Sequence, residues 1–352
     1  MNLQTLLPDV QHYLAQADFC AVPAWQAGTP FAVTPLAQGE YNMNYIVHQD
    51  TRVWVFRVNV GTQINRDDQI LYEYRALKLL APTGVTPRPY FVDDDPGLVD
   101  AEGKAYGVLL MEYLPGEPLD YRRDLDAAAR LFARTHSQPV APEENHLIHE
   151  AQPLSMTYEE CSRLLPVYLE SELADPAFRD YLREVLAWAG EARQHEAYFL
   201  ADPCPCIINT EVNSGNFIAN REQNTLHLVD WEKPLWGDPS QDLSHFRVPT
   251  TTLWKTDYRM TEEDKRSFLT AYRAAIPDAH LRDTIEERVR LRDPFNCLRG
   301  ISWSAMAWVA YVTGAHALKN EDTFRKLNAY LDLDFVHSLF DPYMSSTPHR
   351  MD

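Results

Sequence analysis

The sequence predicts an α+β protein with two lobes: a small N-terminal lobe with an antiparallel sheet and one main helix, and a larger, mainly helical C-terminal lobe. Residues 31–58 are rich in β-branched and aromatic residues between turn residues, which is typical of strands. The run Pro115-Gly116-Glu117-Pro118 interrupts helix and strand alike, and helical periodicity dominates after it. Because a chain of 352 residues exceeds one ordinary domain, we expect lobes at residues 1–114 and 115–352.

The N-terminal lobe begins with an amphipathic helix at residues 3–14, where apolar residues recur at helical spacing. Three strands are expected within residues 31–58, and a glycine-containing turn at residues 38–40 joins the first two. A helix at residues 67–80 follows. The apolar run at residues 107–114 then predicts a buried strand that ends at the proline-rich break.

The C-terminal lobe is expected to hold one hairpin among many helices. The predicted helices cover residues 127–136, 156–173, 177–197, 262–275, 280–298, 301–318 and 323–333. Apolar residues 217–218 and 226–229 flank a polar stretch, which predicts a β-hairpin. Residues 301–318 carry no Lys, Arg, Asp or Glu but only reach the lower length limit for crossing a membrane. A buried helix is favoured, in which Trp303, Trp308 and Tyr311 serve core packing rather than a cation-binding surface.

The charge balance restricts the class of partner. Lys and Arg number 32 and Asp and Glu 51, which gives a net charge of −19. Such a surface repels nucleic acid and anionic lipid, so we expect neither a nucleic-acid nor a membrane partner. It favours a cationic small molecule in an acidic cleft, although acidity that serves only solubility explains the same excess. Five scattered cysteines and an N-terminus without a signal or transit pattern indicate a cytoplasmic protein with reduced thiols.

The segment at residues 207–232 holds the residues with the clearest chemical pattern. Glu211 is followed five residues later by Asn216, and Asp230 follows the predicted hairpin. The hairpin would place Asn216 and Asp230 at the ends of adjacent strands. Phosphoryl transfer needs an acid that orients the attacking hydroxyl and oxygen ligands that hold Mg²⁺ against the phosphates, and these three residues supply that set. A solvated loop with inert acids is the alternative interpretation.

At these residues the chain resembles the aminoglycoside phosphotransferase and choline kinase family, which has a protein-kinase-like fold. The resemblance covers roughly residues 30–320 and rests on two stretches, Asn209 to Asn216 and Val229-Asp230-Trp231-Glu232. The family usually has His and Asp where this chain has Asn209 and Glu211. The acid is therefore one methylene longer.

The resemblance implies a Mg²⁺-dependent transfer of the γ-phosphate of ATP or GTP to a hydroxyl of a small molecule such as an aminoglycoside or an amino alcohol. Glu211 would orient or deprotonate the acceptor hydroxyl, and Asn216 and Asp230 would hold Mg²⁺. Arg57 would contact phosphate and Glu73 would brace it. The remaining implied contacts are a loop over the phosphates with Gly39 and Asn42, an adenine-facing backbone at Glu112 and Leu114, and Asp242 bracing the loop of Glu211.

Two other functions remain open at this point. The departures at Asn209 and Glu211, together with Arg57 where kinases place a Lys, suit a catalytically silent relative that binds a nucleotide or a partner. Nucleotidyl transfer on the same fold has no feature of its own in this sequence. The oligomeric state and the acceptor are not indicated.

Overall fold

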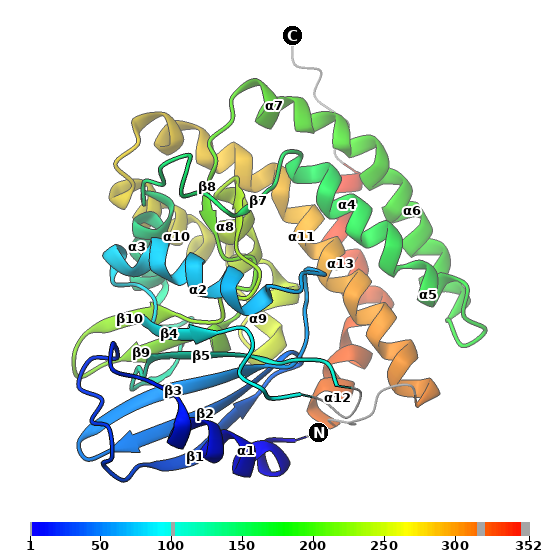
Figure 1. The fold of residues 1–352 in the computed structure, drawn as a ribbon. Helices are drawn as coiled ribbons and strands as arrows, with labels where there is room; N and C mark the ends of the chain where they lie inside the picture. Colours follow the sequence, from blue (N-terminus) through cyan, green and yellow to red (C-terminus); the bar gives the residue numbers. More distant parts are fainter. Residues whose placement is uncertain (1, 100–102, 315–320, 346–352) are drawn as a thin grey trace. The chain divides into compact units, whose positions relative to one another are not determined.

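The structure is a computed structural model that describes residues 2–99, 103–314 and 321–345, and it confirms the predicted α+β class (Figure 1). The chain forms two compact units. The first unit comprises the chain up to Leu119 together with Gln138–Ile148 and Asn216–Leu235. The intervening segments and the chain from Trp236 onward form the second unit.

An antiparallel sheet of five strands, in the order β1-β2-β3-β5-β4, forms the body of the first unit. Its strands are β1 (Ala32–Gln38), β2 (Asn42–Gln49), β3 (Arg52–Asn59), β4 (Pro89–Asp93) and β5 (Gly107–Glu112). The three strands expected within residues 31–58 are therefore confirmed. The central strand β3 pairs with β2 and β5, and its register sets Arg57 between Asn44 and Leu109.

Two helices complete this unit, α1 (Leu3–Gln16) and α2 (Gln69–Leu80). Apolar residues of α1 share one core with the inner side chains of β1, β2 and β3, because the helical stripe and the alternating strands each offer one apolar face. Helix α2 packs on β4 and β5. Gly107 permits this close approach, since a Cβ atom there would lie 2.3 Å from Cγ2 of Ile70.

The predicted hairpin is present as β9 (Phe217–Asn220) and β10 (Thr225–Leu228). A short strand β6 (Glu117–Pro118) pairs with β9 and makes a second, three-stranded sheet. Gly116 precedes β6 with φ +158°, and a Cβ atom there would lie 2.7 Å from the backbone oxygen of Ala219. Only glycine allows the chain to pass this close to β9.

The second unit is mainly helical around a large apolar core. Its helices are α3 (Leu125–His136), α4 (Pro153–Leu164), α5 (Pro166–Leu169), α6 (Pro176–Ala192), α7 (Glu196–Ala201), α8 (Ser240–Arg247), α9 (Pro249–Lys255), α10 (Glu262–Ala275), α11 (Ala279–Thr313), α12 (Glu321–Tyr330) and α13 (Leu333–Met344). Three short strands, β7 (Ile148–His149), β11 (Leu235–Gly237) and β8 (Cys206–Ile208), form a small sheet. β8 leads directly into the loop that carries Glu211.

Several helix predictions were wrong in their boundaries. The two helices expected at 280–298 and 301–318 are one helix of 35 residues, α11, and the last residues of the second range lie outside the described part. Gly300 lies inside this helix, and its missing side chain leaves room for Thr250, which packs closely against it. The helix expected at 156–173 is divided at Pro166, and α13 was not predicted.

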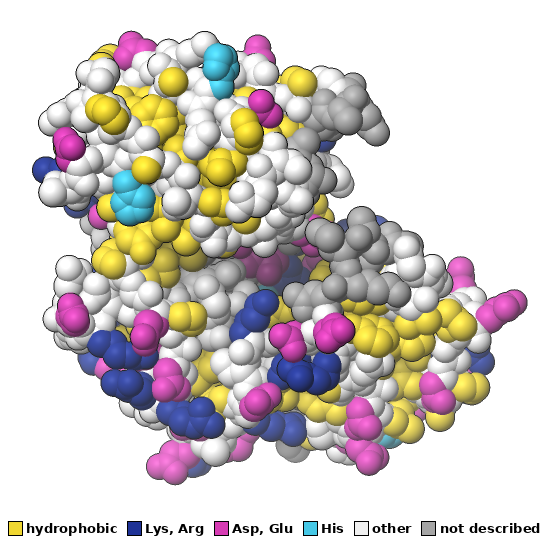
Figure 2. Space-filling view, turned by 90° about the horizontal axis from the view of Figure 1, so that it is seen from below, with side chains coloured by type: hydrophobic (Ala, Val, Ile, Leu, Met, Phe, Trp, Pro, Cys, Tyr) yellow, Lys and Arg dark blue, Asp and Glu magenta, His cyan; other side chains and the backbone are white. Residues whose placement is uncertain are grey.

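Among the described residues, no helix combines the length and the apolarity needed to cross a membrane. The face in Figure 2 carries acidic and basic side chains next to one another, with apolar side chains between them. The net negative charge is therefore not collected into one block on this face. This agrees with the scattered acids of the sequence.

Candidate active site

The hairpin of the first unit ends at Asn216 and Asp230. The amide of Val229 donates to the backbone oxygen of Asn216 over 2.8 Å, which extends the pairing beyond the two strands. Asp230 has φ +64°, a left-handed conformation that Asp adopts more readily than most residues. Trp231 is fully buried, and its Nε1 donates to the backbone oxygen of Leu228 over 2.9 Å. The chain thus turns sharply at Asp230 around a fixed anchor.

Arg57 links this turn to the sheet and to α2. Its Nη1 lies 2.5 Å from Oε1 of Glu73 and 3.3 Å from Oδ1 of Asp230, and its Nε donates to Oδ1 of Asn44 over 3.0 Å. The side chains of Arg57 and Glu73 are 7% and 2% exposed, whereas that of Asp230 is 32% exposed. The predicted ion pair between Arg57 and Glu73 is therefore present, and Asp230 joins it from the hairpin.

Burial and neighbouring charges act in opposite directions on this group. Burial alone disfavours the charged guanidinium, but Glu73 and Asp230 raise the pKa of Arg57, so that it stays charged. Burial also raises the pKa of Glu73, and Arg57 offsets part of that rise. The result is one cation shared by two carboxylates, of which Asp230 is the one that faces solvent.

A cavity of about 270 Å³ in the first unit adjoins these charges. Arg57, Glu73 and Asp230 contribute to its lining, together with Glu112 and Leu114. The rest of the lining is largely apolar and includes Leu36, Val55, Leu77, Met111, Ile218 and Trp231. An apolar cavity with a few convergent charged groups is typical of a small-molecule site.

The loop between β1 and β2 was expected to contact phosphates through Gly39 and Asn42. Gly39 forms a turn in which its amide donates to the backbone oxygen of Asn42 over 2.9 Å. Asn42 is 4% exposed; its Nδ2 donates to Oε2 of Glu232, and its Oδ1 accepts from Nδ2 of Asn59 over 3.0 Å. Asn42 therefore ties the sheet to the residue that ends the Asp-Trp-Glu sequence, a link that the sequence interpretation missed.

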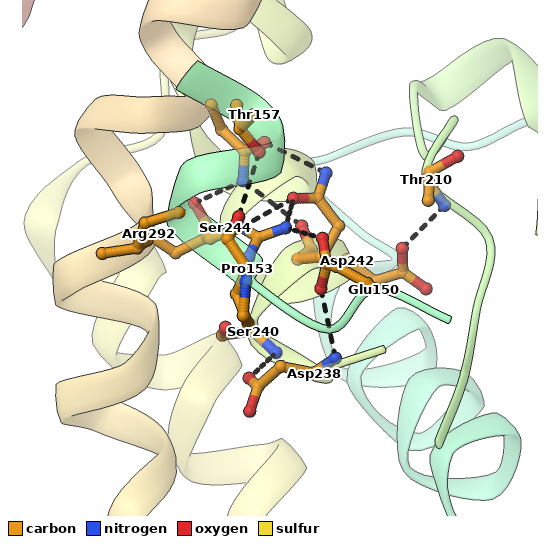
Figure 3. Close-up of polar contacts among 12 residues, drawn as sticks. Glu150, Pro153, Thr157, Thr210, Asp238, Ser240, Asp242, Ser244 and Arg292 are labelled. Atoms are coloured by element: carbon orange, nitrogen blue, oxygen red, sulfur yellow. Dashed lines mark hydrogen bonds and ion pairs between the residues drawn. The ribbon is translucent and has the colours of Figure 1, made fainter. Parts of the chain in front are cut away.

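In the second unit, Asp242 holds the loop that carries Glu211. Its Oδ2 accepts from the amide of Asn209 over 2.8 Å. Its Oδ1 accepts from the amide of Thr210 over 2.9 Å (Figure 3). Asp242 is fully buried. Thr210 has φ +72°, which is rare for a β-branched residue and persists only where the surroundings impose it. The arrangement has the geometry expected of the loop-bracing residue.

Asn209, which stands where the resembled family has His, serves the same loop. Its Oδ1 accepts from the amide of Glu211 over 2.9 Å, and the residue is fully buried. His136 lies behind the loop, with Nδ1 3.0 Å from the hydroxyl of Tyr272 and Nε2 3.5 Å from Oδ2 of Asp242. His136 therefore contacts the side chain that holds the loop.

Arg299 on α11 contacts Glu211 directly, and the sequence interpretation missed it. Its Nη2 lies 3.0 Å from Oε1 of Glu211, its Nη1 donates to the backbone oxygen of Thr210 over 3.1 Å, and its Nε lies 3.2 Å from Oε2 of Glu160. No motif marks this residue, because the contact joins positions 88 residues apart. The only available signal was a cation at the edge of a long uncharged stretch.

A buried polar network lies behind Asp242 in the same unit (Figure 3). The fully buried Arg292 pairs with Glu150, and its Nε donates to Oε1 of Gln241 over 2.8 Å. Asp238 accepts from the amide of Ser240 over 3.0 Å and also pairs with the buried Arg288. These contacts fix the start of α8, and hence Asp242.

The donor atoms at the hairpin end suit a hard divalent cation. Asn216 offers an amide oxygen and Asp230 a carboxylate, which are the oxygen ligands that Mg²⁺ prefers. Asp230 remains partly exposed although Arg57 contacts one of its oxygens. The residues present therefore fit a magnesium site that water and phosphate oxygens would complete.

The model of the phosphotransferase enzyme family matches residues 32–288, a range that contains every site residue predicted from the sequence. Arg299 lies outside the matched range. No curated protein matches the chain.

Three solved structures illustrate the likeness in fold. The microcompartment-associated aminopropanol kinase has a TM-score of 0.64 and 14% identity, with 96% of this chain and 98% of that chain covered. Choline kinase from Cryptosporidium parvum has a TM-score of 0.59 and 12% identity, with 94% of this chain and 97% of that chain covered. Spectinomycin phosphotransferase in complex with ADP and spectinomycin has a TM-score of 0.59 and 12% identity, with 89% of this chain and 93% of that chain covered. At these identities the likeness concerns the fold, and the predicted kinase-like fold is confirmed.

Proposed function

The chain belongs to the phosphotransferase enzyme family, and we propose that it uses Mg²⁺ and ATP, or GTP, to phosphorylate a hydroxyl of a small amino alcohol or amino sugar. Phosphoryl transfer to a small molecule is the activity that follows from the family. The metal, the nucleotide and the acceptor are the parts proposed here.

The cavity in the first unit is the observation that carries the proposal. Its apolar walls suit a nucleobase, and Glu112 and Leu114, which the family resemblance sets opposite the adenine, belong to its lining. Arg57 and Asp230 lie among its lining residues, so that a cation and a metal-binding acid are available to a polyphosphate. A nucleotide combines these two requirements in one molecule.

The residues of the first unit would bind and orient the nucleotide. Asn216 and Asp230 would hold Mg²⁺, which when bound neutralises charge on the phosphate oxygens. Arg57 would donate to a phosphate oxygen. Glu73 keeps the guanidinium in place, because their contact of 2.5 Å is buried and leaves Arg57 little freedom to turn away.

Glu211 in the second unit would accept a hydrogen bond from the acceptor hydroxyl and take its proton as the bond to phosphorus forms. The hydroxyl oxygen attacks phosphorus, and the bond between phosphorus and the bridging oxygen of the nucleoside diphosphate breaks. Asp242 and Asn209 fix the backbone on which Glu211 stands. This arrangement reduces the motion that would otherwise misplace the carboxylate.

An acceptor with an amine is supported by charge. The net charge of −19 raises the local concentration of cations over anions near the protein surface. Two of the structurally similar enzymes, the aminopropanol kinase and the choline kinase, are named for acceptors of this kind. We therefore place amino alcohols first among the acceptors to be tested.

Asp230→Ala tests the metal assignment directly. Calorimetric titration with Mg·ATP should show strongly reduced affinity in this variant, because a carboxylate ligand is lost. Asp94→Ala, which removes an exposed acid of the same unit, is the matched control and should keep the affinity of the wild-type protein. Equal affinity for Mg·ATP in Asp230→Ala and in the wild-type protein would remove Asp230 from the site.

A further inference from the structure

The contact between Arg299 and Glu211 concerns the reaction of the proposed function, on which this inference rests. The guanidinium reaches two consecutive residues of the loop, since it donates to the backbone oxygen of Thr210 and to the carboxylate of Glu211. Asp242 holds the amides of Asn209 and Thr210. Asp242 therefore fixes the loop through two backbone amides, and Arg299 fixes it through a backbone carbonyl and a side chain.

Arg299 is itself well anchored. It stands inside the helix α11, and its side chain is 14% exposed. Glu160 on α4 binds its Nε over 3.2 Å, so that the guanidinium has a second acid to hold it when Glu211 engages another group. Burial disfavours its charge, but Glu160 and Glu211 raise the pKa of Arg299, and the group stays cationic.

A glutamate at the position of the proton-accepting acid needs such an anchor more than an aspartate does. Its side chain has one more rotatable bond, and a free carboxylate of this length occupies several rotamers. Misplacing a reacting group by about 1 Å costs about 10²-fold in rate. A contact of 3.0 Å to a cation on a long helix selects one placement of the carboxylate.

We propose that Arg299 is a positioning residue, which holds the Glu211 carboxylate in the orientation that accepts the proton of the acceptor hydroxyl. It compensates for the extra methylene of Glu211. Arg299 lies outside residues 32–288, which the family model matches, so the inference rests on the contacts of this structure.

The test is a cycle of Arg299→Met, Glu211→Gln and the double variant, with Mg·ATP as donor and ethanolamine, choline, 1-amino-2-propanol, the amino sugar glucosamine, spectinomycin or water as acceptor. Arg299→Met should lower kcat about 10- to 10²-fold and leave the KM for Mg·ATP within about twofold, because the effect lies in the orientation of the base. In the Glu211→Gln background the same change should lower kcat by less than about threefold, since the positioned group is absent. Arg299→Lys should restore part of kcat and serves as the test variant where Arg299→Met does not fold.

Arg247→Met is the matched control. Arg247 is also buried, and it pairs with Asp293, so its loss should lower the unfolding temperature while kcat stays within about threefold. Arg299 would have only a structural role if Arg247→Met and Arg299→Met lowered kcat equally. The same conclusion would follow if Arg299→Met lowered kcat equally with and without Glu211. If the wild-type protein transfers phosphate to none of the acceptors, the proposed function fails. If it does turn over and Arg299→Met keeps full kcat, only the inference fails.

Discussion

Replacing Glu73 by Gln should destabilise the first unit well beyond the cost of an ordinary surface charge. The change removes the negative charge that lies 2.5 Å from Nη1 of Arg57, at a site where the two side chains are 2% and 7% exposed. Removing one partner of a buried ion pair typically costs about 3–5 kcal/mol, because the other charge remains buried without compensation.

Asp230 places the expected cost at the lower end of that range. Its Oδ1 lies 3.3 Å from the same Nη1 atom, and Gln retains one oxygen that accepts a hydrogen bond. We therefore expect a loss of about 3 kcal/mol in the free energy of unfolding for Glu73→Gln. The double variant Arg57→Met/Glu73→Leu should lose less than the sum of its single changes, because no uncompensated charge is left between those two positions.

Urea denaturation with linear extrapolation measures these differences, provided the slope is unchanged. Asp180→Asn is the matched control, since Asp180 pairs with Arg183 over 3.1 Å on the surface of α6, and a loss of at most about 1 kcal/mol is expected. A loss below about 1 kcal/mol for Glu73→Gln would show that the buried pair behaves like a surface pair, contrary to this prediction.

Two further predictions concern the second unit. Burial, and then Arg299, lowers the pKa of His245 from 6.5 to about 4, against the pull of Glu211 and Asp242. As the pH falls from 6.5 toward 4, the unfolded chain therefore takes up this proton before the folded chain does, and the folded state loses at most about 3 kcal/mol of stability. In His245→Gln, the free energy of unfolding should change less with pH across this range. An unchanged pH dependence in the variant would contradict the assignment. Gly300→Ala should lower the free energy of unfolding by about 1–3 kcal/mol although Ala favours helices, because the added Cβ atom would lie 2.6 Å from Cβ of Thr250. Thermal unfolding measures this loss. An increase in stability would show that α11 can shift away from Thr250.

The strands and the hairpin were predictable because their signals are local. Alternating apolar residues and turn residues define β1 to β3 and the pair β9 and β10 without reference to the rest of the chain. Arg57 and Glu73 were predicted through the family resemblance, which implies a cation on this strand and an acid that braces it from α2.

The remaining features depend on contacts between distant residues. Gly300 looks like a helix break until Thr250 is known to lie against it. The contact of Arg299 with Glu211, and that of Asn42 with Glu232, leaves no periodic pattern in the sequence. Such pairs become visible only when tertiary packing brings the elements together.

We expect this chain to transfer phosphate to a hydroxyl with Glu211 as the base. Phosphorus NMR of the wild-type protein with Mg·ATP and a panel of amino alcohols and amino sugars should show a new phosphate ester and ADP for at least one acceptor. With that acceptor, Glu211→Gln should lower turnover roughly 10²–10⁴-fold while the affinity for Mg·ATP stays nearly constant. Equal turnover in the two proteins would show that Glu211 is not the base and favour a chain that binds nucleotide without using Glu211.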